Sequence, residues 1–493
     1  MKKQATLAAL SVLLVLCAVS CGGGEGSTTA ETTASVSADT TAAPVTEEKI
    51  DWSSAGIEAV DYGGKTFTVI TEDIANYHYA WYRVAPDETD GEVLNDALVQ
   101  RNQKIEETFN VDIIEIMSTG VTTDFRNAVT AGDASYDATL NCITHLFSMA
   151  QNGLLVNWYD LPNVNLDAQW WDQSVVSQLT VQDKLFFCTG DISPATNVRV
   201  YSLVFNKDLC RELGLDLPYD AVLNGKWTLD LFYQYIQDVN RDVNGDSVMD
   251  YEDRWGYFSQ NGNSFMMYFA AGGKVVEIDD SGKMVLTMNS NSNIELATKA
   301  LEISIDDNTT LMADDYVTQN GGLWSAASSW FAAGGSLMRS SVFEPVPRDY
   351  RSMDTDFGVL PYPKFDESQE TYYTLAEEFS RMLAVPVTAD TEFVGTMLEV
   401  LAAESVSTVS PAFYDVCLEG KSVRDEESAA VLDILFANKV FDYGLVADVA
   451  GFRSMMINLE KKDSTDVASS FASATKKAET SMKKITEALE GLD

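Results

Sequence analysis

Histidine and basic residues are scarce in this chain. Its 493 residues include only His78 and His145, and 33 Lys and Arg stand against 75 Asp and Glu. No HExxH sequence occurs, which excludes the zinc metalloprotease motif, and no GxSxG sequence marks a nucleophile elbow. The formal charge of −42 repels nucleic-acid phosphates and anionic lipids. The composition therefore excludes a nucleic-acid partner and favours a neutral or cationic ligand.

Phosphate-binding and glycosidase signatures are incomplete. Gly64-Lys65-Thr66 and Gly420-Lys421-Ser422 resemble the end of a P-loop, but Ala59 and Asp415 stand where its earlier glycine is required. The first also precedes an expected strand, whereas a P-loop follows one. We interpret both as turns. Carboxylates are numerous enough to form a glycosidase pair, yet no local spacing marks one.

The first twenty residues have the pattern of a signal peptide. Lys2 and Lys3 precede an apolar run from Ala5 to Val19. This run is shorter than the roughly 20 residues that span a bilayer as a helix. It ends in Ala18-Val19-Ser20-Cys21, which resembles a bacterial lipobox with Ala18 in place of the usual leucine. We therefore expect a signal peptide at residues 1–20 and a lipid anchor on Cys21.

Residues 21–50 are expected to form a flexible tether. The stretch from Gly22 to Glu48 is rich in Gly, Ser, Thr, Ala and Glu and has no apolar periodicity, a composition that does not form a core. A flexible chain of about 27 residues has a root-mean-square span near 26–31 Å. Loss of Lys2 and Lys3 with the signal peptide takes the formal charge from −42 to −44.

The rest of the chain is long enough for two or more domains. Its four cysteines have no CxxC spacing, so the sequence leaves open whether they pair or stay free. They are Cys142, Cys188, Cys210 and Cys417.

Strands and helices alternate along the first part of this body. Strands are predicted at Thr66–Ile70, Val111–Ile116 and Tyr136–Cys142, with helices at Leu94–Phe109 and Phe125–Ala131 between them. The alternation favours a parallel, doubly wound sheet. Ligands of such sheets bind beyond the carboxyl ends of the strands.

A second unit is expected to start with a strand at Tyr201–Phe205. Asn206 is predicted to cap the next helix and Gly214 to end it, and Thr228 is predicted to cap another. Further helices are predicted at Ile294–Ile305, Phe393–Ala403, Ser428–Phe436 and Val467–Leu489. We interpret the two lysine pairs of the last helix, at 476–477 and 483–484, as a solvated face.

Several segments follow one another in an order typical of one protein family. They are Asp90–Ala97 with Arg101, Asn102, Glu106 and Glu107; Gly132–Ala138; Asn152–Trp158; Phe205–Leu209; Trp255–Tyr257 with Ala270–Gly273; and Phe357–Pro363. Together they resemble the extracellular solute-binding proteins of bacterial carbohydrate ABC importers, the family that includes maltose-binding protein. The similarity extends from about Asp61 to Pro386.

The resemblance implies a two-lobed periplasmic-binding-protein fold of type II, an α/β fold whose doubly wound sheets are joined by a hinge. Lobe 1 is expected to comprise residues 61–195 and 357–405, and lobe 2 residues 201–345 and 410–493. The chain is expected to cross between the lobes at Asp191–Tyr201 and at Phe343–Phe357. The C-terminal helices are expected to return to the second lobe.

The twelve residues from Asp242 to Asp253 have the spacing of a calcium-binding loop. Calcium needs six or more oxygen ligands, which such a loop supplies from positions 1, 3, 5, 7, 9 and 12. Ser247 stands at the glycine position, and an aspartate replaces the final glutamate. An acidic surface turn is the alternative, since Asn-Gly-Asp is also turn chemistry. The predicted Ca²⁺ ligands, in a structural role, are Asp242, Asn244, Asp246, the Val248 carbonyl, Asp250 and Asp253.

Sugar sites combine aromatic faces with polar side chains, because a pyranose ring presents an apolar face and a rim of hydroxyls. Trp81 and Trp324 are predicted to stack on the ligand, and Arg339 is a candidate at a strand end. We interpret Trp158, Trp170, Trp171 and Trp227 as packing residues. By position in the family pattern, the resemblance implies ligand contacts from Asn141, Thr144, His145, Gln260, Asn263 and Phe265.

The resemblance implies an extracytoplasmic, lipid-anchored, monomeric protein that captures a sugar or oligosaccharide for ABC permease subunits and is not an enzyme. One alternative is a lipid-anchored polysaccharide-degrading enzyme, and another is a binding protein for a peptide or other polar solute. A dockerin-like module is disfavoured because it carries two calcium loops in tandem, whereas one is found here.

Overall fold

Four strands form the first sheet, in the order β12-β3-β1-β2. The computed structural model describes residues 50–73, 80–319, 323–350, 353–418 and 426–492. Strands β1 (Lys65–Glu72), β2 (Val111–Ser118) and β3 (Ala138–Cys142) run parallel, as predicted. Strand β12 (Arg381–Ala384) pairs antiparallel with β3. This edge strand differs from the all-parallel prediction, because it enters the sheet from a distant part of the chain without a crossover helix.

Helices cover the first sheet where apolar side chains recur at helical spacing. The predicted helices are confirmed as α1 (Val93–Phe109) and α2 (Val121–Thr130). Leu94, Leu98 and Phe109 make up part of the buried face of α1. The other elements of this part are η1 (Trp52–Ala55), η2 (Ala80–Tyr82), α3 (Ile143–Gln151), η3 (Trp158–Asp160), α4 (Gln173–Leu179) and α12 (Thr391–Ser405).

Arg101 fixes α1 to three other segments from inside the core. Its side chain is 1% exposed and donates hydrogen bonds to the carbonyls of Val84 (2.5 Å) and Ile192 (2.6 Å) and to the Ser405 hydroxyl (3.1 Å). Burial lowers the pKa of Arg101 to about 9. Since buried carbonyls need donors, this one guanidinium satisfies groups from segments far apart in the sequence.

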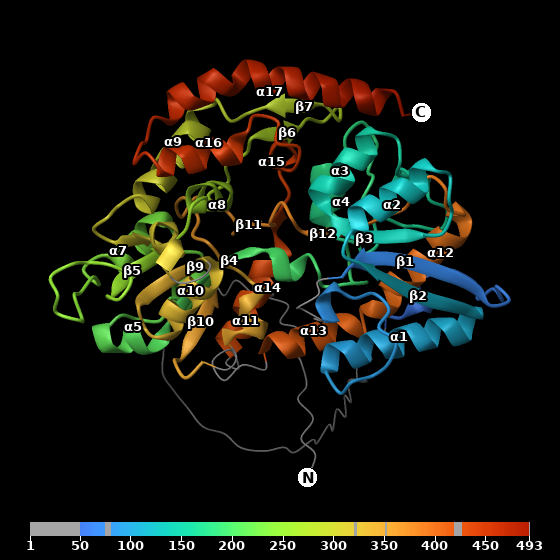
Figure 1. Cartoon of the computed structure of the whole chain (residues 1–493), viewed down its shortest axis with the longest axis horizontal. Coiled ribbons are helices and arrows are strands. Elements are labelled where there is room, and N and C mark those ends of the chain that lie inside the picture. The colour runs from blue at the N-terminus through green and yellow to red at the C-terminus, as the bar shows by residue number, and fades with distance from the viewer. Residues whose placement is uncertain (1–49, 74–79, 320–322, 351–352, 419–425, 493) are drawn as a thin grey trace, which may run out of the picture. The chain divides into compact units, whose positions relative to one another are not determined.

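Five strands form the second sheet, in the order β10-β4-β9-β5-β8, on the other side of Figure 1. Strands β9, β5 and β8 are parallel to one another, whereas β4 pairs antiparallel with both β9 and β10. The strands are β4 (Tyr201–Asn206), β5 (Trp255–Ser259), β8 (Thr310–Met312), β9 (Ser336–Val342) and β10 (Phe357–Leu360).

Two predicted helix caps are present beside this sheet. The Asn206 side chain accepts a hydrogen bond from the Leu209 amide, and Gly214 ends α5 (Lys207–Leu213) with a φ of 70°. Thr228 caps α7 (Leu229–Ile236) through the amide of Leu231. The other elements here are α6 (Tyr219–Leu223), α8 (Asn263–Ala270), β6 (Val276–Ile278), β7 (Met284–Leu286), α9 (Asn291–Ser304), η5 (Ala313–Gln319), α10 (Leu323–Ala332) and α11 (Pro345–Arg348).

Two segments join the sheets. The first connection, residues 189–200, includes η4 (Asn197–Arg199) and leads into β4, as predicted. The second connection, residues 361–380, includes β11 (Thr374–Leu375) and leads from β10 to β12. Because β9 and β10 both pair with β4, the expected crossing at Phe343–Phe357 is wrong, and the return to the first sheet comes after Leu360. The other lobe boundaries stay predictions.

The C-terminal helices contact both parts of the fold. They are α13 (Val409–Leu418), α14 (Glu426–Ala437), α15 (Tyr443–Val446), α16 (Phe452–Glu460) and α17 (Val467–Glu490), with β13 (Lys439–Val440) pairing with β11. Helix α17 packs on α9 and β7 and also on α3 (Figure 1). The Lys184 ammonium donates to the Leu489 carbonyl at its far end (2.9 Å). The expectation that the C-terminal helices return to the second lobe is therefore corrected for α17, which contacts both parts of the fold. The two lysine pairs of α17 are exposed, as predicted.

Four cysteines of the body are free and buried, namely Cys142, Cys188, Cys210 and Cys417. Trp158, Trp170, Trp171 and Trp227 are buried, as predicted for packing residues. Among the helices of the described residues, none has both the length and the apolar character needed to cross a bilayer.

Candidate functional site

A cavity of about 470 Å³ lies where the two sheets and the two connections meet. The first sheet contributes the carboxyl ends of its parallel strands, with Glu72 from β1 and Asn141 and Cys142 from β3. Thr122 of α2 and His145 of α3 follow at the same edge. This is the place where open α/β sheets bind ligands.

The second sheet and the connections supply the other walls. Val342 ends β9, and Glu344 and Arg348 follow it at α11. Arg199 lies on the first connection. The second connection and the start of β12 add Glu377, Phe379 and Arg381. The cavity therefore has residues from both sheets and both crossings in its wall.

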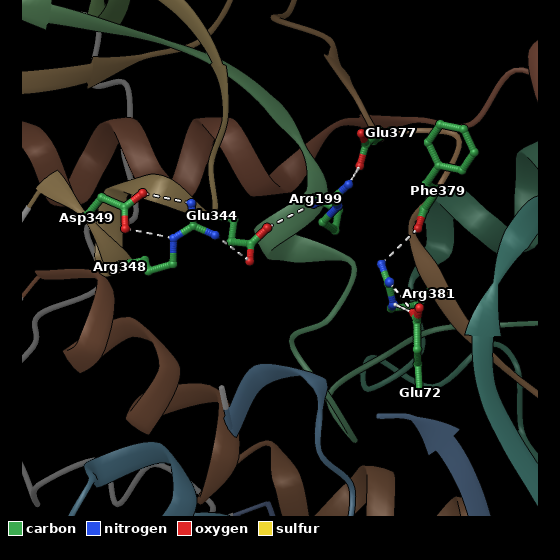
Figure 2. A network of polar contacts seen from close by, with 8 residues as sticks. All are labelled: Glu72, Arg199, Glu344, Arg348, Asp349, Glu377, Phe379 and Arg381. Atoms are coloured by element: carbon green, nitrogen blue, oxygen red, sulfur yellow. Dashed lines mark hydrogen bonds and ion pairs between the residues drawn. The ribbon is translucent and has the colours of Figure 1, made fainter. Parts of the chain in front are cut away.

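A chain of ion pairs runs along the second-sheet wall (Figure 2). Glu344 accepts hydrogen bonds from Arg199 Nη1 through Oε2 (2.9 Å) and from Arg348 Nη1 through Oε1 (3.2 Å). Arg348 also pairs with Asp349 (2.7 Å). Arg199 Nη2 forms a second ion pair, with Glu377. One guanidinium thus joins a carboxylate that follows β9 to a carboxylate of the second connection.

A separate pair lies on the first-sheet wall (Figure 2). Arg381 donates from Nε to Glu72 Oε2 (3.0 Å) and also forms an ion pair with it through Nη2. Its Nη1 donates to the Phe379 carbonyl (3.3 Å). The guanidinium carbon lies 4.9 Å from the ring centre of Tyr82. Arg381 is therefore held by a carboxylate, a carbonyl and an aromatic face.

Burial and charge set the protonation of these groups. Burial raises the pKa of Glu377, and the adjacent Arg199 opposes that rise. Burial acts to lower the pKa of Arg199, but Glu377, Tyr82 and Glu344 together outweigh burial and raise this pKa above its ordinary value. Burial also raises the pKa of the Tyr82 hydroxyl. The pairing of Arg199 with Glu377 therefore favours the charged form of both partners.

Polar and aromatic groups remain for a ligand. The Thr122 hydroxyl lies 3.1 Å from Asn141 Oδ1 and 2.9 Å from His145 Nδ1. Asn141 is 2% exposed, and its Nδ2 has no hydrogen-bond partner among the described residues. Buried amide donors rarely stay unpaired in native structures. Phe379 is 43% exposed, so an aromatic face and an amide donor are available at one cavity.

The predicted ligand residues fall into two groups in space. Asn141 and His145 line the cavity. Trp81, Gln260, Asn263, Phe265 and Arg339 are buried away from it, and Thr144 lies beside Cys142. The side chain of Trp324, at the start of α10, lies outside the described residues. The ligand contacts predicted for these residues stay predictions.

Sequence reasoning missed the charged wall of the cavity. The sequence predicts a crossing that contains Arg199 but no role for its side chain, and no motif in it marks Glu377, Phe379 or Arg381. The run Glu377-Glu378-Phe379-Ser380-Arg381 combines two acids, a ring and an arginine within five positions. That density, in a segment joining the two halves, was the available signal. For Glu344, the spacing to Arg348, four positions on, was a local signal, whereas Arg199 lies 145 positions away and could not be paired with it from the sequence.

In the predicted calcium loop, the carboxylates of Asp242 and Asp253 accept hydrogen bonds from backbone amides of the loop itself. Asp242 accepts from the amides of Gly245 (2.6 Å) and Ser247 (2.9 Å), and Asp253 from those of Val243 (2.9 Å) and Asp250 (3.0 Å). Ser247 has a φ of 66°, the left-handed conformation that favours glycine. Within the described residues, no group of three or more His, Cys, Asp or Glu side chains is arranged to hold a metal ion.

Comparison with known proteins gives a result only at the level of structure. No protein-family model matches the chain, and no curated protein matches its sequence. The solved ABC substrate-binding protein Lmo0181 from Listeria monocytogenes, in complex with cycloalternan, has a TM-score of 0.52 and 14% identity, covering 87% of this chain and 99% of that chain.

Two further solved structures are similar. A cyclo/maltodextrin-binding protein complexed with maltotetraose has a TM-score of 0.55 and 14% identity, covering 85% of this chain and 98% of its own. The apo form of RafE from Streptococcus pneumoniae has a TM-score of 0.53 and 13% identity, again covering 85% and 98%. The fold implied by the resemblance is thereby confirmed: this chain has the two-lobed α/β fold of the ABC substrate-binding proteins.

Proposed function

We propose that this protein captures a sugar or short oligosaccharide and presents it to an ABC importer. The observation that carries the proposal is the cavity itself, whose wall combines both sheets, both connections, an unpaired buried amide and an exposed aromatic ring. Its volume of about 470 Å³ lies within the range of small-molecule sites. The hydroxyl groups of a sugar can accept a hydrogen bond from the Asn141 amide and donate to the carboxylates, and the C–H face of its ring can stack on Phe379.

The proposed mechanism is closure of two lobes about a hinge formed by the connections. A ligand that contacts Asn141 on one side and Glu344 on the other binds the closed state more tightly than the open state. It therefore shifts the population toward closure. No bond is made or broken in this cycle, so we propose a binding protein and not an enzyme.

The anchor and the partners belong to the same proposal. Cys21 would carry the lipid, residues 21–50 would form the tether, and the body would act as a monomer outside the cytoplasm. Permease subunits would receive the closed, loaded form. The sequence pattern of residues 1–21 supports this arrangement.

A glycan panel tests the proposal directly. We expect at least one mono- or oligosaccharide to raise the melting temperature of the purified protein and to give a dissociation constant by calorimetry. Asn141→Ala should weaken binding about tenfold, because it removes one buried hydrogen bond worth roughly 1–1.5 kcal/mol. Asn152→Ala, which changes an exposed amide bonded to its own helix, is the matched control. Release of reducing ends or unsaturated sugars from any glycan would contradict the binding-protein proposal.

We also propose that the loop from Asp242 to Asp253 binds Ca²⁺ in a structural role. The support is the oxygen-ligand spacing and the left-handed conformation of Ser247. Calorimetric titration with Ca²⁺ should give heat, and Ca²⁺ should raise the melting temperature. Ser247→Gly should tighten binding by relieving backbone strain. Absence of heat with both proteins would reject the site.

A further inference from the structure

We infer that the ligand of this cavity is uncharged and that Glu344 is the residue that excludes anionic sugars. The inference rests on the proposed sugar-binding function and specifies its substrate class. It is carried by the pairing of the charged side chains that line the cavity (Figure 2).

The described cavity wall holds equal numbers of positive and negative side chains. Three arginines and three glutamates line it, with histidine counted as neutral at pH 7. Each glutamate forms an ion pair with one of the arginines of the same wall. Although the whole chain is strongly acidic, this cavity is therefore balanced, and its guanidinium groups are already engaged by protein carboxylates.

Glu344 has a special place among these acids because two arginines share it. Arg199 and Arg348 each donate to a different oxygen of its carboxylate. The Glu344 side chain is 9% exposed. A ligand carboxylate that accepts from the remaining N–H donors of these two guanidinium groups lies beside the Glu344 carboxylate, and each arginine of the wall is already paired with a glutamate, so the charge of the ligand has no cation of its own. Such an unpaired buried charge is strongly unfavourable.

Hydroxyl groups do not meet this obstacle. A carboxylate oxygen has lone pairs beyond those used by its arginine, and a guanidinium carries five N–H donors. A sugar hydroxyl can donate to the first and accept from the second while every ion pair stays intact. The network therefore accepts neutral polyols and rejects uronates of the same size.

The test compares neutral sugars with uronates that differ only at C6. The probes are glucose and galactose and their disaccharides, each beside the uronate in which the C6 hydroxymethyl group is a carboxylate. Calorimetry gives the ratio of the uronate and neutral dissociation constants. We expect this ratio to exceed about 100 for the wild type. Glu344→Gln should lower the ratio at least tenfold, since it frees guanidinium donors for an anionic ligand.

Two variants serve as controls, and a third provides a second test. Glu344→Asp keeps the charge and should keep the ratio. Glu212→Gln, at a surface pair with Arg254, should leave it unchanged. Glu72→Gln frees Arg381 at a more exposed site, with a glutamate side chain 38% exposed, and should lower the ratio even where Glu344→Gln proves too unstable to purify.

The outcomes separate the inference from the function on which it rests. Tight uronate binding by the wild type, or an unchanged ratio in folded Glu344→Gln protein, would overturn the inference and leave sugar binding intact. If Glu344→Gln cannot be purified, an unchanged ratio in Glu72→Gln would overturn it. Failure of every sugar, neutral or acidic, to bind the wild type would overturn the proposed function and the inference with it.

Discussion

Glu399 provides a test of the buried electrostatics that does not depend on any ligand. This residue of α12 is fully buried, and its Oε2 accepts a hydrogen bond from Trp171 Nε1 (2.9 Å). Burial raises the pKa of Glu399 from 4.5 to about 7, and the hydrogen bond from Trp171 opposes part of that rise. The folded protein therefore holds this proton more tightly than the unfolded chain does.

The sign of the pH effect follows from proton linkage. Unfolding releases a proton between the unfolded pKa of 4.5 and the folded pKa of about 7. The free energy of unfolding therefore falls as the pH rises through this window. At 1.36 kcal/mol per pKa unit, the contribution lost between pH 5 and pH 8 is about 2.5 kcal/mol.

The Glu399→Gln variant isolates this contribution. Its amide oxygen can still accept the hydrogen bond from Trp171, but it has no proton to lose. We expect the variant to gain stability relative to the wild type by about 2.5 kcal/mol on going from pH 5 to pH 8. Urea unfolding at pH 5, 6, 7 and 8 measures the difference, in which the titration of all other groups cancels.

A matched control lies on the same helix. Glu392 is exposed in the first turn of α12, and the difference between Glu392→Gln and the wild type is the baseline for the same substitution on the surface. If the difference for Glu399→Gln varies with pH no more than this baseline does, the buried carboxyl of Glu399 is ionised throughout the range and the reasoning fails.

Three further changes test the packing. Arg101→Met removes the donor of the Ile192 carbonyl and one of the two donors of the Val84 carbonyl, and it should lower the free energy of unfolding by about 2–3 kcal/mol. A loss below about 1 kcal/mol in urea unfolding would contradict its role. Asn206→Ala removes the cap of α5 and should cost about 1 kcal/mol, measured in the same way. Gly358→Ala places a methyl group against the Tyr219 hydroxyl and the Phe205 ring and should lower the melting temperature by several degrees. Combining it with Tyr219→Phe should restore part of that loss, and a fully additive pair would argue against the clash with the hydroxyl.

Local patterns in the sequence predicted the elements but not their pairing. Asn206, Gly214 and Thr228 act within one or two turns of helix, and their roles follow from capping chemistry alone. The antiparallel direction of β12 could not be predicted from local patterns, because β12 pairs with β3 from about 240 positions away in the chain. The wrong crossing at Phe343–Phe357 has the same origin, since β10 pairs with β4 from a distance.

The residues of the candidate site also differ in whether they could be predicted from the sequence. The resemblance to the family implied ligand contacts from Asn141 and His145, and the structure has Asn141 near the end of β3 and His145 in α3, both in the cavity wall. Aromatic content alone did not identify the exposed ring, since Trp81 is buried whereas Phe379 is not. Exposure of a loop side chain depends on the segments that fold over it. Arg199 and Glu377 meet only after the chain has crossed twice.

Arg199 links the architecture of the fold to the chemistry of the cavity. It lies on the first connection and pairs with Glu377 of the second connection and with Glu344 behind β9. Loss of either pair would leave a buried carboxylate with one fewer partner, which destabilises the fold. Any movement of the two halves about these connections must therefore keep the pairs intact, and a ligand must bind around them. Hydroxyl groups can do so because they both donate and accept without adding charge, whereas a carboxylate adds a negative charge beside glutamates that already pair with the arginines. The same ion pairs thus join the two connections and carry our inference that the ligand is neutral.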